Sequence, residues 1–184
     1  LKRDQVSEYL KNLEQEERKI LRNLGVKFGR YHVFLFNLIK PEAVSLRTLL
    51  WKNYHQKYFD LKPPTFGLNF VDDKNLKNRN FMLLCGFEKF DNLFVRIDIL
   101  ERLFMKIINS KDEKEIKMIP EMLNLLGCSK ENFKKLIKAM NYKIIEKNNE
   151  VYFIYLQKKQ AKKIFNKKSN KENPFNVLKN LNFN

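Results

Sequence analysis

The chain has 184 residues, of which 43% are hydrophobic, so it is long enough to bury a core and its composition excludes an intrinsically disordered protein. Its 37 Lys and Arg residues outnumber 21 Asp and Glu residues, and the net charge of +16 favours an anionic partner, nucleic acid first. No apolar run reaches the length of a membrane span, and no secretory signal is recognisable, which predicts a cytoplasmic protein without a membrane partner.

Two explanations of the positive charge stay open. Lysine and asparagine are abundant while alanine, glycine and arginine are scarce, a bias typical of AT-rich genomes, so part of the charge can be compositional. The distribution of the charge along the chain favours a functional role for it, because residues 157–184 carry eight lysines and one glutamate. We predict that this segment begins as a helix over 157–165 and continues as a basic tail with salt-sensitive attraction to nucleic acid.

The first third of the chain predicts helices followed by an extended segment and a longer helix. Residues 4–24 keep helical spacing, and Gly25 stands where a glycine ends a helix. Gly25 and Gly29 allow positive φ or close backbone approach. Pro41 suits the first turn of the next helix, whose apolar stripe is Val44, Leu46, Leu49, Leu50 and Tyr54. The segment from 24 to 51 is typical of a buried scaffold.

The middle of the chain contains the clearest linker signal, Lys62-Pro63-Pro64, because two prolines stop both a helix and a central strand. We place a domain boundary there. Residues 65–80 are predicted to be irregular, with a turn at 72–75. A short apolar piece, 81–85, is closed by Gly86, and residues 87–97 predict a β-hairpin with its turn at Asp91-Asn92.

A helix is predicted over 98–109, with Asp98 as its N-cap and Glu101 completing a capping box. Its buried side would be formed by apolar residues at helical spacing, which are Ile99, Leu100, Leu103, Ile107 and Ile108.

The region from 120 to 155 predicts a winged helix-turn-helix. Pro120 opens a helix to 126, Gly127-Cys128 makes a turn, Ser129 caps a second helix over 130–140, and the strands 142–145 and 151–155 pair as a wing. The second helix carries Lys130, Lys134, Lys135 and Lys138 away from its apolar side, an arrangement that suits phosphate contacts. A lysine-rich solvated helix in a domain that packs on protein is the alternative.

Catalytic motifs are absent from the sequence: it contains no GxxxxGK[ST], GxGxxG, HExxH or GxSxG. His32 lies in an aromatic segment and is predicted to be structural, and His55 is predicted to be exposed. A zinc site would need both histidines to converge with Cys85 and Cys128, which form no CxxC pair, so we expect free thiols. The chain is not predicted to be an enzyme by itself.

Several short stretches, in a fixed order, carry a resemblance to a known family. They are residues 24–29 (LGVKFG), 33–35 (VFL), 38–41 (LIKP), 49–51 (LLW), 95–98 (VRID), 100–103 (LERL), 125–128 (LLGC) and 173–178 (NPFNVL). Over nearly its whole length the chain resembles the C-terminal region of the large alphaproteobacterial helicases related to the mitochondrial degradosome RNA helicase, of the DExH type in superfamily 2. The family tends to have proline where this chain has Phe36.

The resemblance implies that the ATPase motor, with its ATP and Mg²⁺, lies upstream and outside this chain, so that no catalytic residue or cofactor is expected here. The first residue is leucine, which also predicts a piece of a longer protein. What the resemblance implies is an accessory module attached to a motor that unwinds RNA or DNA. Its partners would be the nucleic acid and the motor domains of the same parent chain.

We therefore predict an α+β fold, predominantly helical, with a helical subdomain at 1–62, a winged-helix-like region with short β-hairpins at 63–156 and a basic tail at 157–184. The predicted nucleic-acid contacts are all basic: Lys27, Arg30, Lys130, Lys134, Lys135, Lys138, Lys158, Lys159, Lys162, Lys163, Lys167 and Lys168. Two alternatives stay open. One is a protein-docking scaffold for the motor or a nuclease, anchored by Phe175, Val177 and Leu178. The other is a separate winged-helix DNA-binding regulator.

Overall fold

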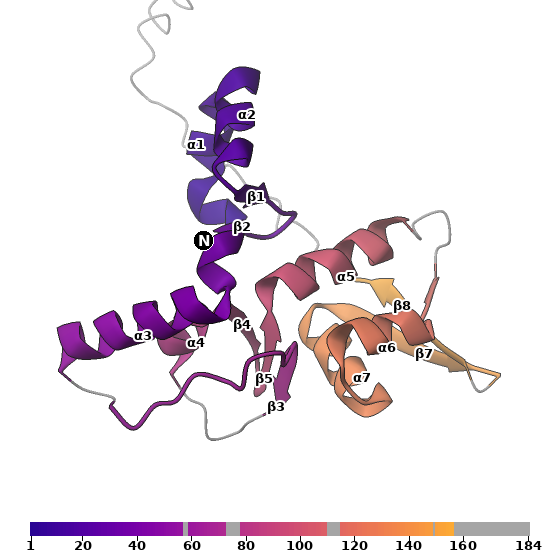
Figure 1. Cartoon of the computed structure of the whole chain (residues 1–184). Helices are drawn as coiled ribbons and strands as arrows, with labels where there is room; N and C mark the ends of the chain where they lie inside the picture. Colours follow the sequence, from indigo (N-terminus) through magenta and orange to yellow (C-terminus); the bar gives the residue numbers. More distant parts are fainter. Residues whose placement is uncertain (57–58, 73–77, 110–114, 149, 157–184) are drawn as a thin grey trace, which may run out of the picture.

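The computed structural model describes residues 1–56, 59–72, 78–109, 115–148 and 150–156. Over these residues the chain is an α+β protein whose strands form small antiparallel sheets, as the sequence predicts (Figure 1). None of the described helices has the length and apolar character that crossing a membrane requires. The predicted basic tail and its apolar end lie outside the described residues.

The first 40 residues form short helices and one hairpin. The helical elements are η1 (Arg3–Val6), α1 (Ser7–Asn12), α2 (Gln15–Asn23) and η2 (Phe36–Ile39). Gly25 has a φ of +90°, and its N–H donates to the Arg22 carbonyl at 2.9 Å, so it ends α2 as predicted. The extended segment that follows is a hairpin of β1 (Val26–Phe28) and β2 (Val33–Leu35).

The long helix α3 (Pro41–His55) begins at proline, as predicted, but its predicted buried stripe is wrong. Only Val44 of that stripe is buried, and Thr48 is the other buried position. The remaining stripe residues are exposed, with exposed fractions of 57% for Leu46, 56% for Leu49, 57% for Leu50 and 84% for Tyr54. Helix α3 packs on α4 with the side that carries Val44. The position of this packing partner, and not the number of leucines, therefore determines which side of α3 is buried.

The middle of the chain forms a three-stranded antiparallel sheet in the order β3-β5-β4. The predicted hairpin is confirmed as β4 (Phe87–Phe90) and β5 (Leu93–Arg96), and its turn residue Asp91 has a φ of +52°. The structure adds β3 (Phe70–Asp72) within the segment that was predicted to be irregular. The short apolar piece is a helix, α4 (Arg79–Leu84), capped by the side chain of Asn78. Most of the predicted turn at 72–75 lies outside the described residues.

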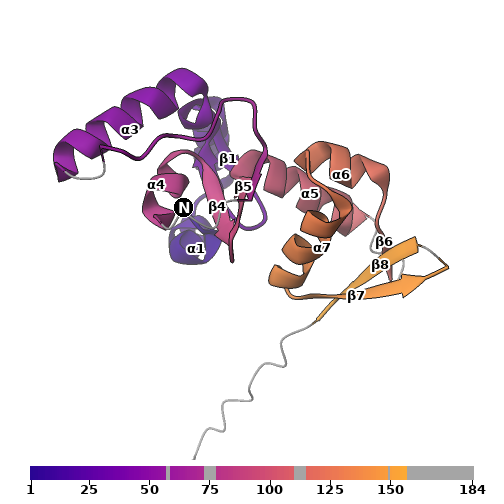
Figure 2. The same cartoon turned by 90° about the horizontal axis from the view of Figure 1, so that it is seen from below.

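The last described part contains three helices and a second three-stranded sheet. Its elements are α5 (Ile97–Asn109), β6 (Ile116–Lys117), α6 (Pro120–Leu126), α7 (Lys130–Ala139), β7 (Tyr142–Lys147) and β8 (Glu150–Tyr155), and the sheet order is β6-β8-β7 (Figure 2). The predicted Ser129 cap of α7 is confirmed, since its hydroxyl accepts the N–H of Asn132 at 3.2 Å. The two-residue strand β6 was not predicted.

The buried side chains form two cores. The larger lies among β5, α5, α6, α7 and the second sheet, and its fully buried members include Leu100, Leu103, Leu136 and Phe153. The smaller consists of Val44, Phe81, Met82, Cys85, Phe87 and Phe94. The smaller core draws residues from both sides of the Lys62-Pro63-Pro64 segment. The division into subdomains at 62 stays a prediction.

Among the described residues the same local unit occurs three times: a helix, one residue with positive φ, and a β-hairpin. The residues with positive φ are Gly25 (+90°) after α2, Gly86 (+86°) after α4 and Asn141 (+65°) after α7. Glycine tolerates this conformation, and asparagine is the commonest substitute for it. Each of these residues turns the chain directly from a helix into a strand that packs beside it.

Candidate functional site

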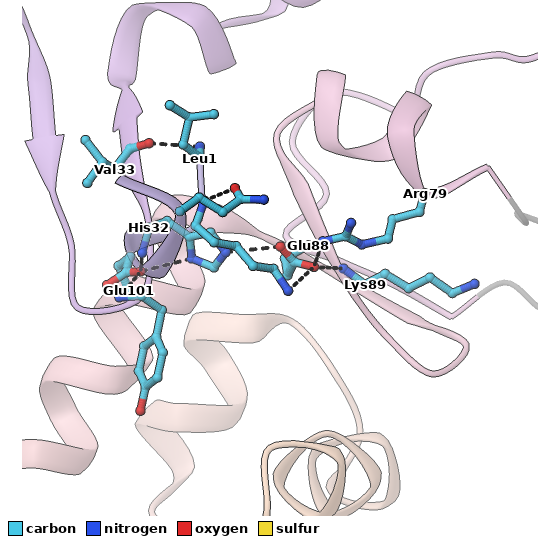
Figure 3. A network of polar contacts seen from close by, with 10 residues as sticks. Leu1, His32, Val33, Arg79, Glu88, Lys89 and Glu101 are labelled. Atoms are coloured by element: carbon cyan, nitrogen blue, oxygen red, sulfur yellow. Dashed lines mark hydrogen bonds and ion pairs between the residues drawn. The ribbon is translucent and has the colours of Figure 1, made fainter. Parts of the chain in front are cut away.

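The most densely bonded polar group in the described chain surrounds His32, which is only 4% exposed. Its Nδ1 lies 3.1 Å from Oε1 of Glu101 on α5, and its Nε2 lies 3.1 Å from Oε2 of Glu88 on β4 (Figure 3). Where both carboxylates are ionised they only accept hydrogen bonds, so both ring nitrogens donate and the ring is then an imidazolium. The predicted structural role of His32 is therefore confirmed in its burial and its contacts.

Glu101 holds the turn between β1 and β2 to helix α5. Its carboxylate accepts the backbone N–H groups of Arg30 at 2.5 Å, Tyr31 at 3.1 Å and His32 at 2.8 Å. A Cβ built on Gly29 would lie 2.4 Å from Cδ of Glu101, so only glycine allows the carboxylate to approach this closely. Four successive residues of the turn are thus shaped around one side chain.

The predicted capping box of the helix at 98–109 is wrong for this reason. The helix α5 begins at Ile97, and Asp98 forms an ion pair with Arg96, whose Nε donates to Oδ1 at 2.7 Å. Glu101 turns instead to the backbone of a segment about 70 positions earlier in the chain. In a capping box the carboxylate accepts a backbone N–H at the start of its own helix. Here the Glu101 carboxylate instead accepts the backbone N–H groups of residues 30–32.

Glu88 is compensated by several cations. Besides its contact with His32, the Glu88 carboxylate accepts a hydrogen bond from Nη2 of Arg79 at 2.9 Å, and Nζ of Lys2 lies 3.7 Å from its Oε1. Burial alone would raise the pKa of Glu88, but the hydrogen bonds from His32 and Arg79 outweigh it and lower the pKa to about 2. Burial alone would lower the pKa of His32, but its bonds to Glu101 and Glu88 outweigh this and raise the pKa above its ordinary value. The cluster is a paired, structural ion network.

The predicted basic side chains lie on α7, which also carries Glu131. Lys130, Lys135 and Lys138 are exposed, and Lys134 forms an ion pair with Glu146 of β7. The hydrogen bond and charge of Lys134 lower the pKa of Glu146, and Lys130 and Lys138 contribute to the same shift. These three lysines therefore share one face of α7, as their spacing predicts.

Two other lysines of this region pair with carboxylates. Glu115 accepts Nζ of Lys147 at 2.7 Å, and Glu150 pairs with Lys117. Lys117 and Lys147 are therefore each paired with a carboxylate.

The remaining predicted contacts are not brought onto this helix. Lys27 is exposed on β1, and Arg30 is exposed in the β1–β2 turn. Neither residue lies on α7, and in Figures 1 and 2 helix α5 lies between that hairpin and α7. Lys158, Lys159, Lys162, Lys163, Lys167 and Lys168 lie outside the described residues.

The cysteines and His55 do not form a common site. Cys85 is buried in the smaller core, Cys128 packs against the larger core, and both are free thiols. His55 is exposed on α3, as predicted, and its ring contacts Trp51 and Tyr54. Within the described ranges, no cluster of three or more His, Cys, Asp and Glu residues is placed to hold a metal ion.

Comparison of the chain with family models, with curated proteins and with solved structures found no match.

Proposed function

We propose that this chain is a nucleic-acid-binding accessory region of an ATP-dependent helicase, whose motor domains, with their ATP and Mg²⁺, are not in this chain. The observation that carries the proposal is the order of the last elements. The succession α5, β6, α6, α7, β7, β8, with the sheet order β6-β8-β7, supports the proposal, because two helices joined by a short turn and followed by a β-hairpin are the order expected of a winged helix-turn-helix. A cytoplasmic location accompanies this function.

In such a module α7 is the helix that faces the nucleic acid. Its exposed lysines are point charges on flexible stems, which suit phosphates better than base edges. The chain offers little arginine for base-edge readout, so we expect binding with weak sequence preference. This expectation fits an accessory region that guides a strand for a motor better than it fits a sequence-specific regulator.

The test is fluorescence anisotropy with single-stranded RNA, single-stranded DNA and duplex over a salt series. We expect the Lys130→Gln/Lys138→Gln variant to bind more weakly and to reduce the slope of log K against log salt by about 2 for duplex, because each lost phosphate contact removes about 0.9. The matched control, Lys11→Gln/Lys62→Gln, removes the same charge from exposed positions on α1 and after α3.

Equal losses in the two double variants would show that only total charge matters and would contradict a site on α7. Absence of wild-type binding above low salt would contradict the proposal itself. Deleting residues 157–184 tests the tail separately, and we expect weaker binding with a flatter salt dependence.

A gain-of-function variant tests the same helix from the opposite direction. Glu146→Gln removes the carboxylate beside Lys130, Lys134 and Lys138, so we expect binding to tighten by a few fold. Glu8→Gln on α1 removes an acidic charge from a remote exposed position and serves as control. If both variants tighten binding equally, the effect belongs to net charge and not to α7.

A second candidate function is docking on protein, and the exposed side of α3 favours it. Leu46, Leu49, Leu50 and Tyr54 are all more than half exposed on consecutive turns of one helix. Exposed apolar groups of this kind mark interaction surfaces. The partner would be the motor domains of the parent chain. A Leu46→Ser/Leu50→Ser variant should lose a complex that the wild-type region forms with purified motor domains, and an unchanged complex would exclude α3 as the contact.

A further inference from the structure

A cleft of about 250 Å³ lies where three distant parts of the chain meet. The β1–β2 turn contributes Tyr31, helix α5 contributes Phe104, and the end of β8 contributes Tyr155. Ligand pockets for drug-sized molecules occupy roughly 300–1,000 Å³, so this cleft suits a smaller flat group.

The two tyrosines that line the cleft are exposed, with exposed fractions of 40% for Tyr31 and 50% for Tyr155. Both side chains line the same cleft, and the pKa of Tyr31 is raised first by burial and then by the charge of Tyr155. A stacking ligand needs an aromatic face that is open to solvent, and these two side chains offer aromatic surface inside a concave site.

Tyr31 is held in place before any ligand arrives. Its backbone N–H donates to Glu101 at 3.1 Å, and its ring packs on Phe104 with 3.7 Å between ring centroids. Because the Glu101 clamp immobilises the turn, a ligand that stacks here does not have to pay for ordering it. The hydrogen bonds of Glu101 therefore fix the position of Tyr31 at the edge of the cleft.

The charges of the cleft favour a base inside it and a phosphate outside. Lys89 and Lys2, whose Nζ lies 3.7 Å from Glu88, line it and can reach a nucleic-acid backbone, whereas Asp4 would repel a phosphate placed within. Asn141 and the C-terminal end of α7 border the same cleft, and the helix dipole is negative at that end. A neutral nucleobase meets none of these penalties.

We propose that this cleft binds an unpaired nucleobase of a single-stranded nucleic acid, stacked against Tyr155 and Tyr31, with the adjoining phosphates on Lys2 and Lys89. This inference rests on the proposed nucleic-acid-binding function and adds to it the form of the ligand. A base within a duplex is already stacked and paired, so the cleft selects single strands over duplex.

The test compares Tyr155→Ala with Tyr155→Phe, using a short labelled single strand and a duplex of the same sequence. Loss of one stacking platform should weaken single-strand binding about 5- to 100-fold. The phenylalanine variant keeps the ring and should bind as the wild type does, and duplex affinity should change in neither variant.

A second readout is the fluorescence of the strand itself. A strand that carries the fluorescent base 2-aminopurine should lose emission when the wild-type protein stacks on it, and the loss should disappear in Tyr155→Ala. Unchanged single-strand affinity in Tyr155→Ala, equal losses for single strand and duplex, or wild-type binding without quenching would each overturn the cleft while leaving α7 as a phosphate site. Failure of the wild type to bind any strand would overturn both proposals.

Discussion

Replacing Glu101 with glutamine is the sharpest test of how the first third of the chain is attached to the rest. The substitution keeps the size of the side chain and one acceptor oxygen but removes the charge. Oε1 accepts the N–H groups of Tyr31 and His32 and the His32 ring, while Oε2 accepts only the N–H of Arg30. A glutamine would therefore place its NH₂ group opposite the Arg30 N–H and retain three weaker, neutral acceptor bonds.

The magnitude follows from these contacts. Losing one charge-assisted hydrogen bond costs about 1.5–3 kcal/mol. Removing one partner of a buried ion pair costs about 3–5 kcal/mol, but His32 keeps its second carboxylate, Glu88. We expect the free energy of unfolding to fall by about 3 kcal/mol, a large share of the ~5–15 kcal/mol that holds a typical domain folded.

Urea unfolding of Glu101→Gln and of a control, Glu115→Gln, measures this effect. Glu115 also forms an ion pair with a lysine, but at the surface, where such pairs contribute about 0–1 kcal/mol. Amide hydrogen exchange should show the loss of protection concentrated at residues 30–32. The reasoning is refuted if both variants cost the same, or if exchange at 30–32 does not change.

Three further predictions follow from the same interior. Gly29→Ala should destabilise the protein by about 1–3 kcal/mol, because its Cβ would overlap the carboxylate of Glu101, and the cost should shrink when Glu101 is also alanine. The raised pKa of His32 contributes stability that is fully present below the ordinary pKa of 6.5 and is lost as pH rises through the raised pKa. The lowered pKa of Glu88 contributes stability that is fully present above the ordinary pKa of 4.5 and is lost as pH falls toward about 2. Unfolding free energy should therefore be greatest between about pH 4.5 and 6.5, and an unchanged alkaline limb in His32→Gln would contradict this account. Burial raises the pKa of Cys85 to about 12, so a thiol reagent at pH 8 should react with it only as fast as the core opens, with a rate that rises in urea; rapid reaction without denaturant would contradict its buried position.

Local features were predictable from the sequence because their causes are local. Gly25, Pro41 and Ser129 mark helix ends through backbone geometry or a hydrogen bond to a residue three positions away, and all three act as predicted. The hairpins at 87–96 and 142–155 follow from alternating apolar residues around a turn. The lysine face of α7 follows from helical spacing alone.

What depends on long-range packing was not predictable. The leucines of α3 have the spacing of a buried stripe, yet α4 covers the side that carries Val44 and leaves those leucines exposed. Strands as short as β3 and β6 carry almost no pattern of their own and form because a longer strand offers them an edge.

The site residues divide in the same way. The sequence alone determines the positive charge, the helical register of Lys130, Lys134 and Lys138, and the glycines at which the chain turns. Only the tertiary structure decides that Glu101 reaches Gly29 and His32, and that Tyr31 and Tyr155 line one cleft, because these arrangements join segments whose separation along the chain carries no periodic signal. A carboxylate can satisfy donors anywhere within reach of its oxygens, and the fold determines which donors lie within that reach.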